Sequence, residues 1–163
     1  MKYSKALKDL EWARKEVTGK QLEEMRKFLP DEIDGIKGES DDSSAVMGLH
    51  SVSKVYRDLN TGNNVKIEIM KGSSGDGATG LGAIIGMAAA MGTMDQGGQS
   101  KTIVHKGYRG TFSMNSEINE GQLVFSLDGG SMVTIETRGY PDETMAKKTA
   151  EKLDLAAIEE KMK

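Results

Sequence analysis

The chain opens with hydrophobic residues at helical spacing. A first amphipathic helix is predicted over residues 4–17. One of its faces collects four apolar side chains: Tyr3, Leu7, Leu10 and Val17. Thr18 and Gln21 have the spacing of a capping box, so a second helix is expected to follow and to end before Pro30. Its apolar positions are Leu22, Met25 and Leu29. These two helices form a predicted N-terminal segment, residues 1–29, ahead of one α+β domain, residues 30–163.

Alternation of apolar and polar side chains predicts six strands in the rest of the chain. The first two cover residues 46–58 and 65–69 and are joined by a turn at 60–63. The other four cover residues 102–105, 108–114, 123–127 and 132–137. Turns are expected at Lys106-Gly107 and at Asp128-Gly129, a dipeptide favoured in tight hairpins. A last helix is expected after Asp142, and Asp154 is expected to cap a short final turn.

Between the two groups of strands lies an apolar segment, residues 78–94, without a charged side chain. As a helix it has small side chains on one side and bulky ones, Ile84, Met87, Met91 and Met94, nearly opposite. A helix that is apolar all round must be covered on every side. A sheet covers one side, and the terminal helices, a second subunit or lipid cover the other. We favour the terminal helices and place a dimer second, with the bulky stripe as the candidate interaction surface.

The order of these elements, ββ-α-ββββ-α after the N-terminal helices, defines the predicted fold class. It is α+β, with a mostly antiparallel sheet of about six strands, a central apolar helix and terminal helices packed on the sheet. The segment 78–94 would be about 25 Å long, whereas a helix that crosses a bilayer needs about 20 residues. Membrane contact is therefore the weaker interpretation.

Composition narrows the classes of function. The 163 residues carry a net charge of −3 and no cysteine. An acidic chain does not attract nucleic acid, so no nucleic-acid partner is expected. Without cysteine, disulfides and thiolate zinc sites are excluded. The chain begins with a polar helix, and no signal peptide is visible at its start.

A glycine-rich loop is the best match to a ligand-binding motif. Gly75, Gly77 and Gly80 fit the GxGxxG spacing between a predicted strand and the apolar helix, where backbone amides can hold a pyrophosphate. The motif belongs to a βαβ unit, however, and antiparallel hairpins follow here. Asp95, at about the distance of the ribose-binding acid, ends the helix instead. We treat these glycines as weak candidates and expect no cofactor.

The other candidates do not converge on a catalytic set. The acids of residues 30–44 lack the pattern of a calcium loop, which favours a solvated connection. His50 and His105 lie in predicted strands without a metal-ligand partner at zinc-site spacing, so no metal is expected. Tyr108, Arg109 and Phe112 are too narrow a set for a single-strand nucleic-acid groove. The sequence therefore predicts a protein that is not an enzyme.

Several short segments resemble a family of uncharacterised bacterial proteins. They begin with Phe28-Leu29-Pro30 with Ile33 and Gly35 and continue with Met47-Gly48, Tyr56-Arg57-Asp58, residues 65–69, the Gly/Ala/Met helix, Val133-Thr134-Ile135 and Lys152-Leu153-Asp154-Leu155. The opening run, residues 5–10, is similar to some members. Members often carry an export signal or lipoprotein leader, so the resemblance implies the periplasm or cell envelope. It implies no activity and no catalytic residues.

Three hypotheses follow from the sequence. The first is a non-enzymatic binding or protein-interaction domain of the bacterial cell envelope, with self-association as one form. The second is a nucleotide or phosphate ligand held at residues 75–80. The third is peripheral membrane association through residues 78–94.

Overall fold

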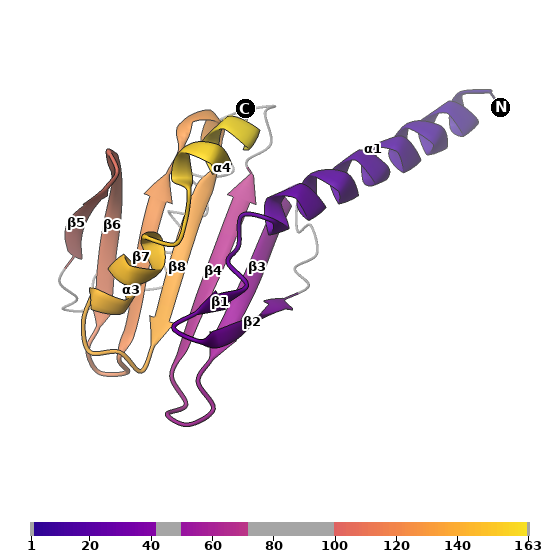
Figure 1. The fold of residues 1–163 in the computed structure, drawn as a ribbon. Helices are drawn as coiled ribbons and strands as arrows, with labels where there is room; N and C mark the ends of the chain where they lie inside the picture. The colour runs from indigo at the N-terminus through magenta and orange to yellow at the C-terminus, as the bar shows by residue number, and fades with distance from the viewer. Residues whose placement is uncertain (1, 42–49, 72–99, 163) are drawn as a thin grey trace.

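The computed structural model describes residues 2–41, 50–71 and 100–162, and these form an α+β fold around an eight-stranded sheet (Figure 1). The elements are α1 (Lys2–Arg26), β1 (Glu32–Ile33), β2 (Ile36–Asp41), β3 (His50–Arg57), β4 (Asn64–Lys71), β5 (Ser100–His105), β6 (Tyr108–Asn115), β7 (Glu120–Ser126), β8 (Met132–Arg138), α3 (Thr144–Ala150) and α4 (Leu155–Met162). The α+β class and the antiparallel sheet agree with the sequence prediction.

The sheet consists of two meanders joined at its centre. Its order is β1-β2-β3-β4-β8-β7-β6-β5, and every neighbouring pair is antiparallel. Alternate side chains point to one face and build the core there. Ile69, Val133 and Phe125 lie in one row of this core, and Ile67, Ile135 and Leu123 lie in the next. The helices α3 and α4 cover this face (Figure 1).

The prediction of six strands was wrong, because the segment expected to be a solvated acidic connection contains β1 and β2. Asp34 and Gly35 adopt positive φ angles of 52° and 78° between paired residues Ile33 and Ile36. This is the backbone of a two-residue hairpin turn, for which Asp-Gly is a favoured sequence. The hairpin then pairs with β3 from Gly38 to Asp41. Its strands are short and rich in acid, which hid the alternation.

The turns that the sequence predicted between later strands were only partly right. Lys106 and Gly107 have positive φ angles and join β5 to β6 directly, as expected. The turn expected at Asp128-Gly129 is instead a short 3₁₀ turn over Asp128–Gly130, closed by a hydrogen bond from Leu127 N to Ser131 O of 2.9 Å. A second glycine at positive φ, Gly130, lengthens this connection beyond a two-residue hairpin loop.

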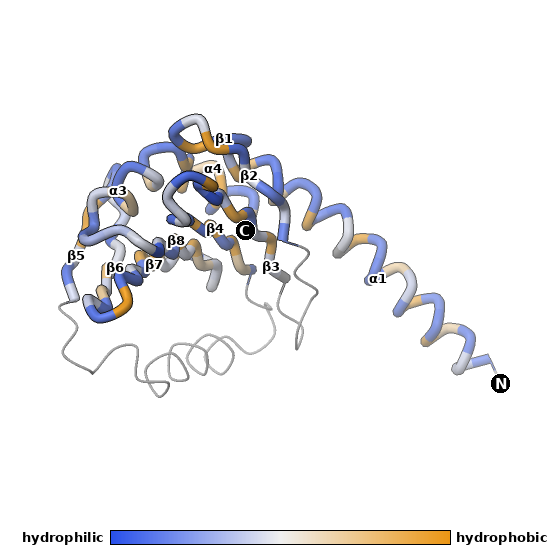
Figure 2. The backbone as a smooth tube through the Cα atoms, turned by 90° about the horizontal axis from the view of Figure 1, so that it is seen from below, coloured by the Kyte–Doolittle hydropathy of each residue, from blue (hydrophilic) through white to orange (hydrophobic). Residues whose placement is uncertain are grey.

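The N-terminal segment is one helix rather than the two that were predicted. The helix α1 runs for 25 residues through the expected break at residue 18. An ion pair of 3.8 Å between Glu16 and Lys20, one turn apart, bridges that position and favours continuity. Only the end of α1 reaches the body of the protein, where Met25 and then Leu29 enter the core. The rest projects into solvent (Figures 1 and 2).

Two side chains of β3 fix the chain where α1 ends. The hydroxyl of Tyr56 donates to the carbonyl oxygen of Pro30 at 2.5 Å. The ammonium of Lys54, whose side chain is only 13% exposed, donates to Leu29 O and Pro30 O and forms an ion pair of 3.0 Å with Asp31. These contacts satisfy carbonyls that follow the last helical turn.

The C-terminal helices begin close to where the sequence indicated, although Glu143, one residue after the predicted cap Asp142, occupies the N-cap of α3. The segment predicted as a short final turn is the eight-residue helix α4. The side chain of Asp142 accepts a hydrogen bond of 2.9 Å from the backbone of Thr144, and that of Asp154 accepts one of 3.0 Å from Ala157. Such side-chain acceptors satisfy amides of the first helical turn. The buried residues of the two helices are Met145, Ala146, Thr149, Ala150, Leu155, Ile158 and Met162.

Candidate functional site

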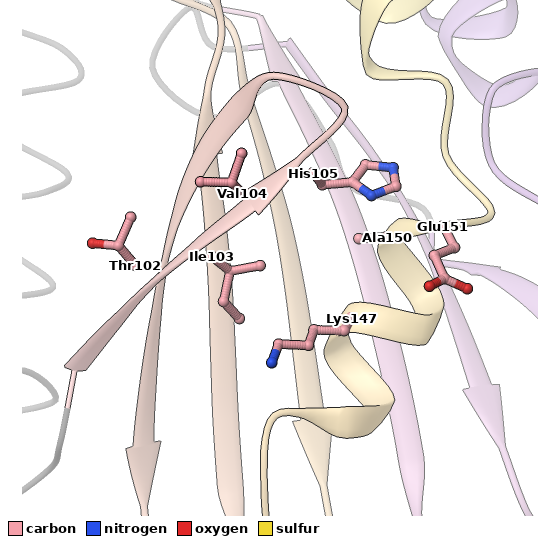
Figure 3. A pocket seen from close by; sticks show the side chains of 7 residues that line it. All are labelled: Thr102, Ile103, Val104, His105, Lys147, Ala150 and Glu151. Atoms are coloured by element: carbon pink, nitrogen blue, oxygen red, sulfur yellow. The ribbon is translucent and has the colours of Figure 1, made fainter.

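The candidate site is a groove between the edge strand β5 and the helix α3. The groove has a volume of about 290 Å³ (Figure 3). It is lined by Thr102, Ile103, Val104, His105, Lys147, Ala150 and Glu151. Residues far apart in the sequence thus form its two walls, and the close view shows Lys147 and Glu151 on the helix wall opposite the strand.

The groove reaches the backbone edge of β5. Neighbouring side chains of a strand point to opposite faces of the sheet. Ile103 and His105 lie on the face that α3 covers, whereas Thr102 and Val104 lie on the other face. A cavity that touches four consecutive residues therefore extends along the edge itself. On its other side β5 pairs with β6, and no described strand pairs with its outer edge.

Charged side chains lie at both ends of the groove. At the start of β5, the ammonium of Lys101 lies 3.2 Å from both carboxylate oxygens of Glu143, and Lys147 lies 3.4 Å from one of them. Hydrogen bonds from the start of α3 lower the pKa of Asp142 and the charges of both lysines lower it further, so two cations face two carboxylates at this end. Hydrogen bonds from the backbone of Glu143 and from Lys101 lower the pKa of the Glu143 carboxyl. At the other end stands Glu151, which forms no ion pair within the described residues.

His105 lies at the same end of the groove as Glu151. Burial lowers the pKa of His105 below its usual value and the charge of Lys106 adds to this, while the carboxylate of Glu151 acts in the opposite direction. The imidazole packs edge-on against the ring of Phe125, with 6.5 Å between centroids. Its Nε2 atom is buried and has no hydrogen-bond partner in the described parts of the chain. His105 is therefore uncharged near neutral pH, and its ring lines the groove.

A glycine in β6 leaves the space that the ring of Phe125 needs to pack against His105. A Cβ atom on Gly110 would lie 2.8 Å from the ring of Phe125. Without that atom, the ring lies over β6 and reaches towards β5. Glycine in a strand interior commonly marks such a close approach.

Most residues singled out from the sequence lie outside the described ranges. These are the glycine loop with Gly75, Gly77 and Gly80, and the segment 78–94 with Ile84, Met87, Met91 and Met94. The nucleotide and membrane hypotheses, and the cover of the apolar helix, remain untested predictions. Among the helices that are described, none is long and apolar enough to cross a bilayer.

The remaining candidate residues, the two histidines and the aromatic-basic set on β6, do not come together in the structure. His50 lies in β3 and His105 in β5, with four strands between them, which places their backbones roughly 24 Å apart at about 4.8 Å per strand. Within the described ranges, no three His, Asp or Glu side chains are grouped as metal ligands. Phe112 is buried on the core face, whereas Arg109 is exposed on the opposite face, so they share no surface.

A second exposed surface lies on α1. Tyr3, Leu7, Leu10 and Val17, the predicted apolar face, are all more than half exposed, and so is Trp12. The sequence pattern located this face correctly as apolar. The prediction that the N-terminal helical segment packs on the sheet was wrong for most of α1, because among the described residues only its C-terminal end contacts the body of the protein (Figure 2). At that end the predicted inward residues Leu22 and Met25 do pack against the core.

Neither a family model nor a curated protein matches this sequence. Its function is therefore argued from the groove. An open strand edge beside a helix, with an apolar floor and charged ends, can bind an extended polypeptide through backbone hydrogen bonds, and the groove selects its side chains.

Proposed function

We propose that this chain is a non-enzymatic protein-interaction domain, and that it binds an extended segment of a partner polypeptide along β5. The segment would add a ninth strand to the sheet and place alternate side chains in the groove beside α3. The observation that carries this proposal is the six-residue outer edge of β5, which no described strand pairs.

The contrast between the two edges of the sheet supports this proposal. Natural proteins protect sheet edges with very short strands or with charged residues, since an open edge pairs readily with another chain. The edge strand β1 has two residues. The edge strand β5 has six, and in its middle Val104 is 64% exposed. Beyond β1, the outer edge of β2 also lacks a described strand partner from Glu39 to Asp41, but this stretch is short and polar or acidic. The β5 edge is the longer of the two and exposes an apolar side chain.

The side chains of the groove support binding rather than catalysis. Glu143 is held between Lys101 and Lys147, and Nε2 of His105 is buried against the sheet. The floor consists of Ile103 and Ala150, which suit an apolar side chain of the bound segment. Charged groups at the ends would orient the segment more than they strengthen its binding.

A peptide selection with an edge-blocked variant tests this proposal. Random peptides would be selected on the wild-type protein, and the affinity of enriched peptides would be measured by fluorescence anisotropy. Lysine on an edge strand opposes strand addition, so Thr102→Lys should weaken binding about tenfold or more. Thr111→Lys is the matched control, because Thr111 is exposed on β6 directly opposite Thr102.

Two results would count against strand addition. One is a failure to enrich any peptide over the naked support. The other is enrichment of peptides that bind wild type, Thr102→Lys and Thr111→Lys with equal affinity, since such peptides would contact another surface.

We further propose, from the family resemblance alone, that the protein acts in the bacterial cell envelope. Fractionation of cells that express the native gene with a C-terminal tag tests this location. Recovery in the cytosolic fraction alone would refute it.

A further inference from the structure

We infer that the edge of β5 selects its partner through one large apolar side chain, which lies opposite Ile103 in an antiparallel strand and enters the groove beside α3. This inference rests on the proposed strand addition and names the class of segment that is bound. We call the apolar residue the anchor. The segment carries polar residues two positions before and two positions after it.

The turn after β5 fixes which backbone groups face the open edge of this strand. It has two residues, both at positive φ, so the pair that flanks it, His105 and Tyr108, is a hydrogen-bonded pair. Hydrogen-bonded pairs alternate along the ladder, so Ile103 also turns its backbone groups towards β6. Those of Thr102 and Val104 face outwards. A bound strand therefore pairs with these two residues and places one residue opposite Ile103.

The position opposite Ile103 continues a row of the core. The row has apolar side chains on five strands: Val52, Ile69, Val133, Phe125 and, at its end on β5, Ile103. On β6 the row holds Gly110, over which the ring of Phe125 reaches towards β5. A side chain added opposite Ile103 becomes the next member of this row, and the small side chain of Ala150 leaves space for it in the groove. Cross-strand neighbours of matched character favour an apolar anchor.

The alternate positions on either side of the anchor favour polar residues. They lie opposite Lys101 and His105, the other two residues of β5 that point to this face between its second residue and its end. Lys101 lies 3.2 Å from Glu143. His105 has both Lys106 and Glu151 near it. Charges of both signs thus surround each position, and covering them with an apolar side chain would cost free energy.

An alanine scan of a bound peptide tests the single anchor. The probe is the tightest peptide selected on the wild-type protein whose binding Thr102→Lys blocks. Replacement of its anchor should weaken binding about tenfold or more, because a large apolar side chain is withdrawn from the groove. Replacement two positions before or after the anchor should weaken binding less than about threefold. Two apolar residues of equal weight at such alternate positions would overturn the inference.

The size of the groove gives a second readout. Ile103→Ala enlarges the groove, so it should improve binding of a tryptophan anchor relative to a leucine anchor by about fivefold or more. Ile67→Ala removes the same atoms from the core on β4, away from the groove, and should leave this ratio unchanged. Thermal unfolding would confirm that both variants fold. An unchanged ratio in Ile103→Ala would overturn the position of the anchor.

Disulfide crosslinking tests the register and direction with exposed positions alone. The chain has no cysteine, so one placed on β5 has no competitor. The probe peptide is made with cysteine either one position before or one position after its anchor. In the antiparallel register, Thr102→Cys should link to the later cysteine and Val104→Cys to the earlier one, each about fivefold faster than the opposite combination. Thr111→Cys, exposed on β6, is the matched control and should link to neither.

The inference and the proposed function fail in different ways. Reversed crosslinking, or equal crosslinking of both cysteines, overturns the antiparallel register, although a peptide blocked by Thr102→Lys still supports strand addition. If selection yields only peptides that bind Thr102→Lys as tightly as wild type, strand addition itself fails and the inference fails with it.

Discussion

Gly38 and Tyr56 lie directly opposite each other on β2 and β3, and the tyrosine ring occupies the space that a side chain at position 38 would need. A Cβ atom on Gly38 would lie 2.5 Å from ring atom Cε1 of Tyr56. The ring lies over the glycine and carries its hydroxyl to Pro30. One cross-strand pair thus joins the first hairpin, the third strand and the end of α1.

Substitution of Gly38 by alanine should destabilise the protein. The new methyl group overlaps a buried ring that Pro30 holds in place, and overpacking of this kind costs about 1–3 kcal/mol. Urea unfolding followed by circular dichroism measures the change. Glu39→Ala, at the exposed neighbouring position, should change the free energy of unfolding by less than about 0.5 kcal/mol. Equal effects at both positions would contradict the packing described.

Stability should fall in alkaline solution because of Tyr56. Burial raises the pKa of its hydroxyl, and the negative charge of Asp31 raises it further. The unfolded chain therefore releases this proton first, near pH 10, and the contribution of Tyr56 is complete below that pH. It is lost as the pH rises towards the higher pKa of the folded state.

Denaturation midpoints of wild type and Tyr56→Phe at pH 8 and pH 11 check this expectation. At pH 8 the phenylalanine variant lacks one hydrogen bond and should be about 0.5–1.5 kcal/mol less stable. At pH 11 the gap between the two proteins should narrow. A gap that stays constant would show that Tyr56 ionises as readily when folded as when unfolded.

His105 should make the protein less stable in acid. Its folded-state pKa is lowered, mainly by burial, so the unfolded chain binds a proton more readily. The stability due to neutral His105 is present above its ordinary pKa of 6.5 and is lost as the pH falls below that value. Replacement by phenylalanine keeps a ring beside Phe125 and removes the titration. Between pH 7.5 and pH 5.5, wild type should lose more stability than His105→Phe, and equal losses would refute this assignment.

Two apolar residues on α1 should respond very differently to truncation. Met25 is 2% exposed in the core, whereas Leu10 is 66% exposed on the projecting part of the helix. Met25→Ala should cost about 2–5 kcal/mol in the free energy of unfolding. Leu10→Ala should cost less than about 0.5 kcal/mol. A large loss from Leu10→Ala would mean that another surface covers α1 in solution.

The sequence predicts those parts of the fold whose signals are local. The alternation in Val65, Ile67 and Ile69 identified β4, and Lys106-Gly107 identified the turn after β5. The hairpin at Asp34-Gly35 carried a recognisable turn dipeptide, but acidic strands around it hid the pattern. The break expected at residue 18 was wrong because a capping-box spacing also occurs inside continuous helices.

The candidate groove could not be found from local patterns. Its walls, β5 and α3, are separated by three further strands, and their contact depends on the order of strands in the sheet. Lys101 and Glu143 are 42 positions apart in the chain. The sequence of neither segment indicates that the other lies beside it in the fold. The edge position of β5 likewise follows from the pairing of β4 with β8, which the sequence does not show.

That central pairing has a consequence for how fast the chain folds. Within each half of the sheet, every strand lies beside its neighbour in the chain, so hairpins can close quickly. The seam between the halves sets Met70 opposite Met132, 62 positions later, and the entropy of closing so long a loop must be met before the seam forms. We therefore expect assembly of the two halves to limit the folding rate. Substitutions along the seam should then slow folding, whereas those in the outer strands should mainly accelerate unfolding.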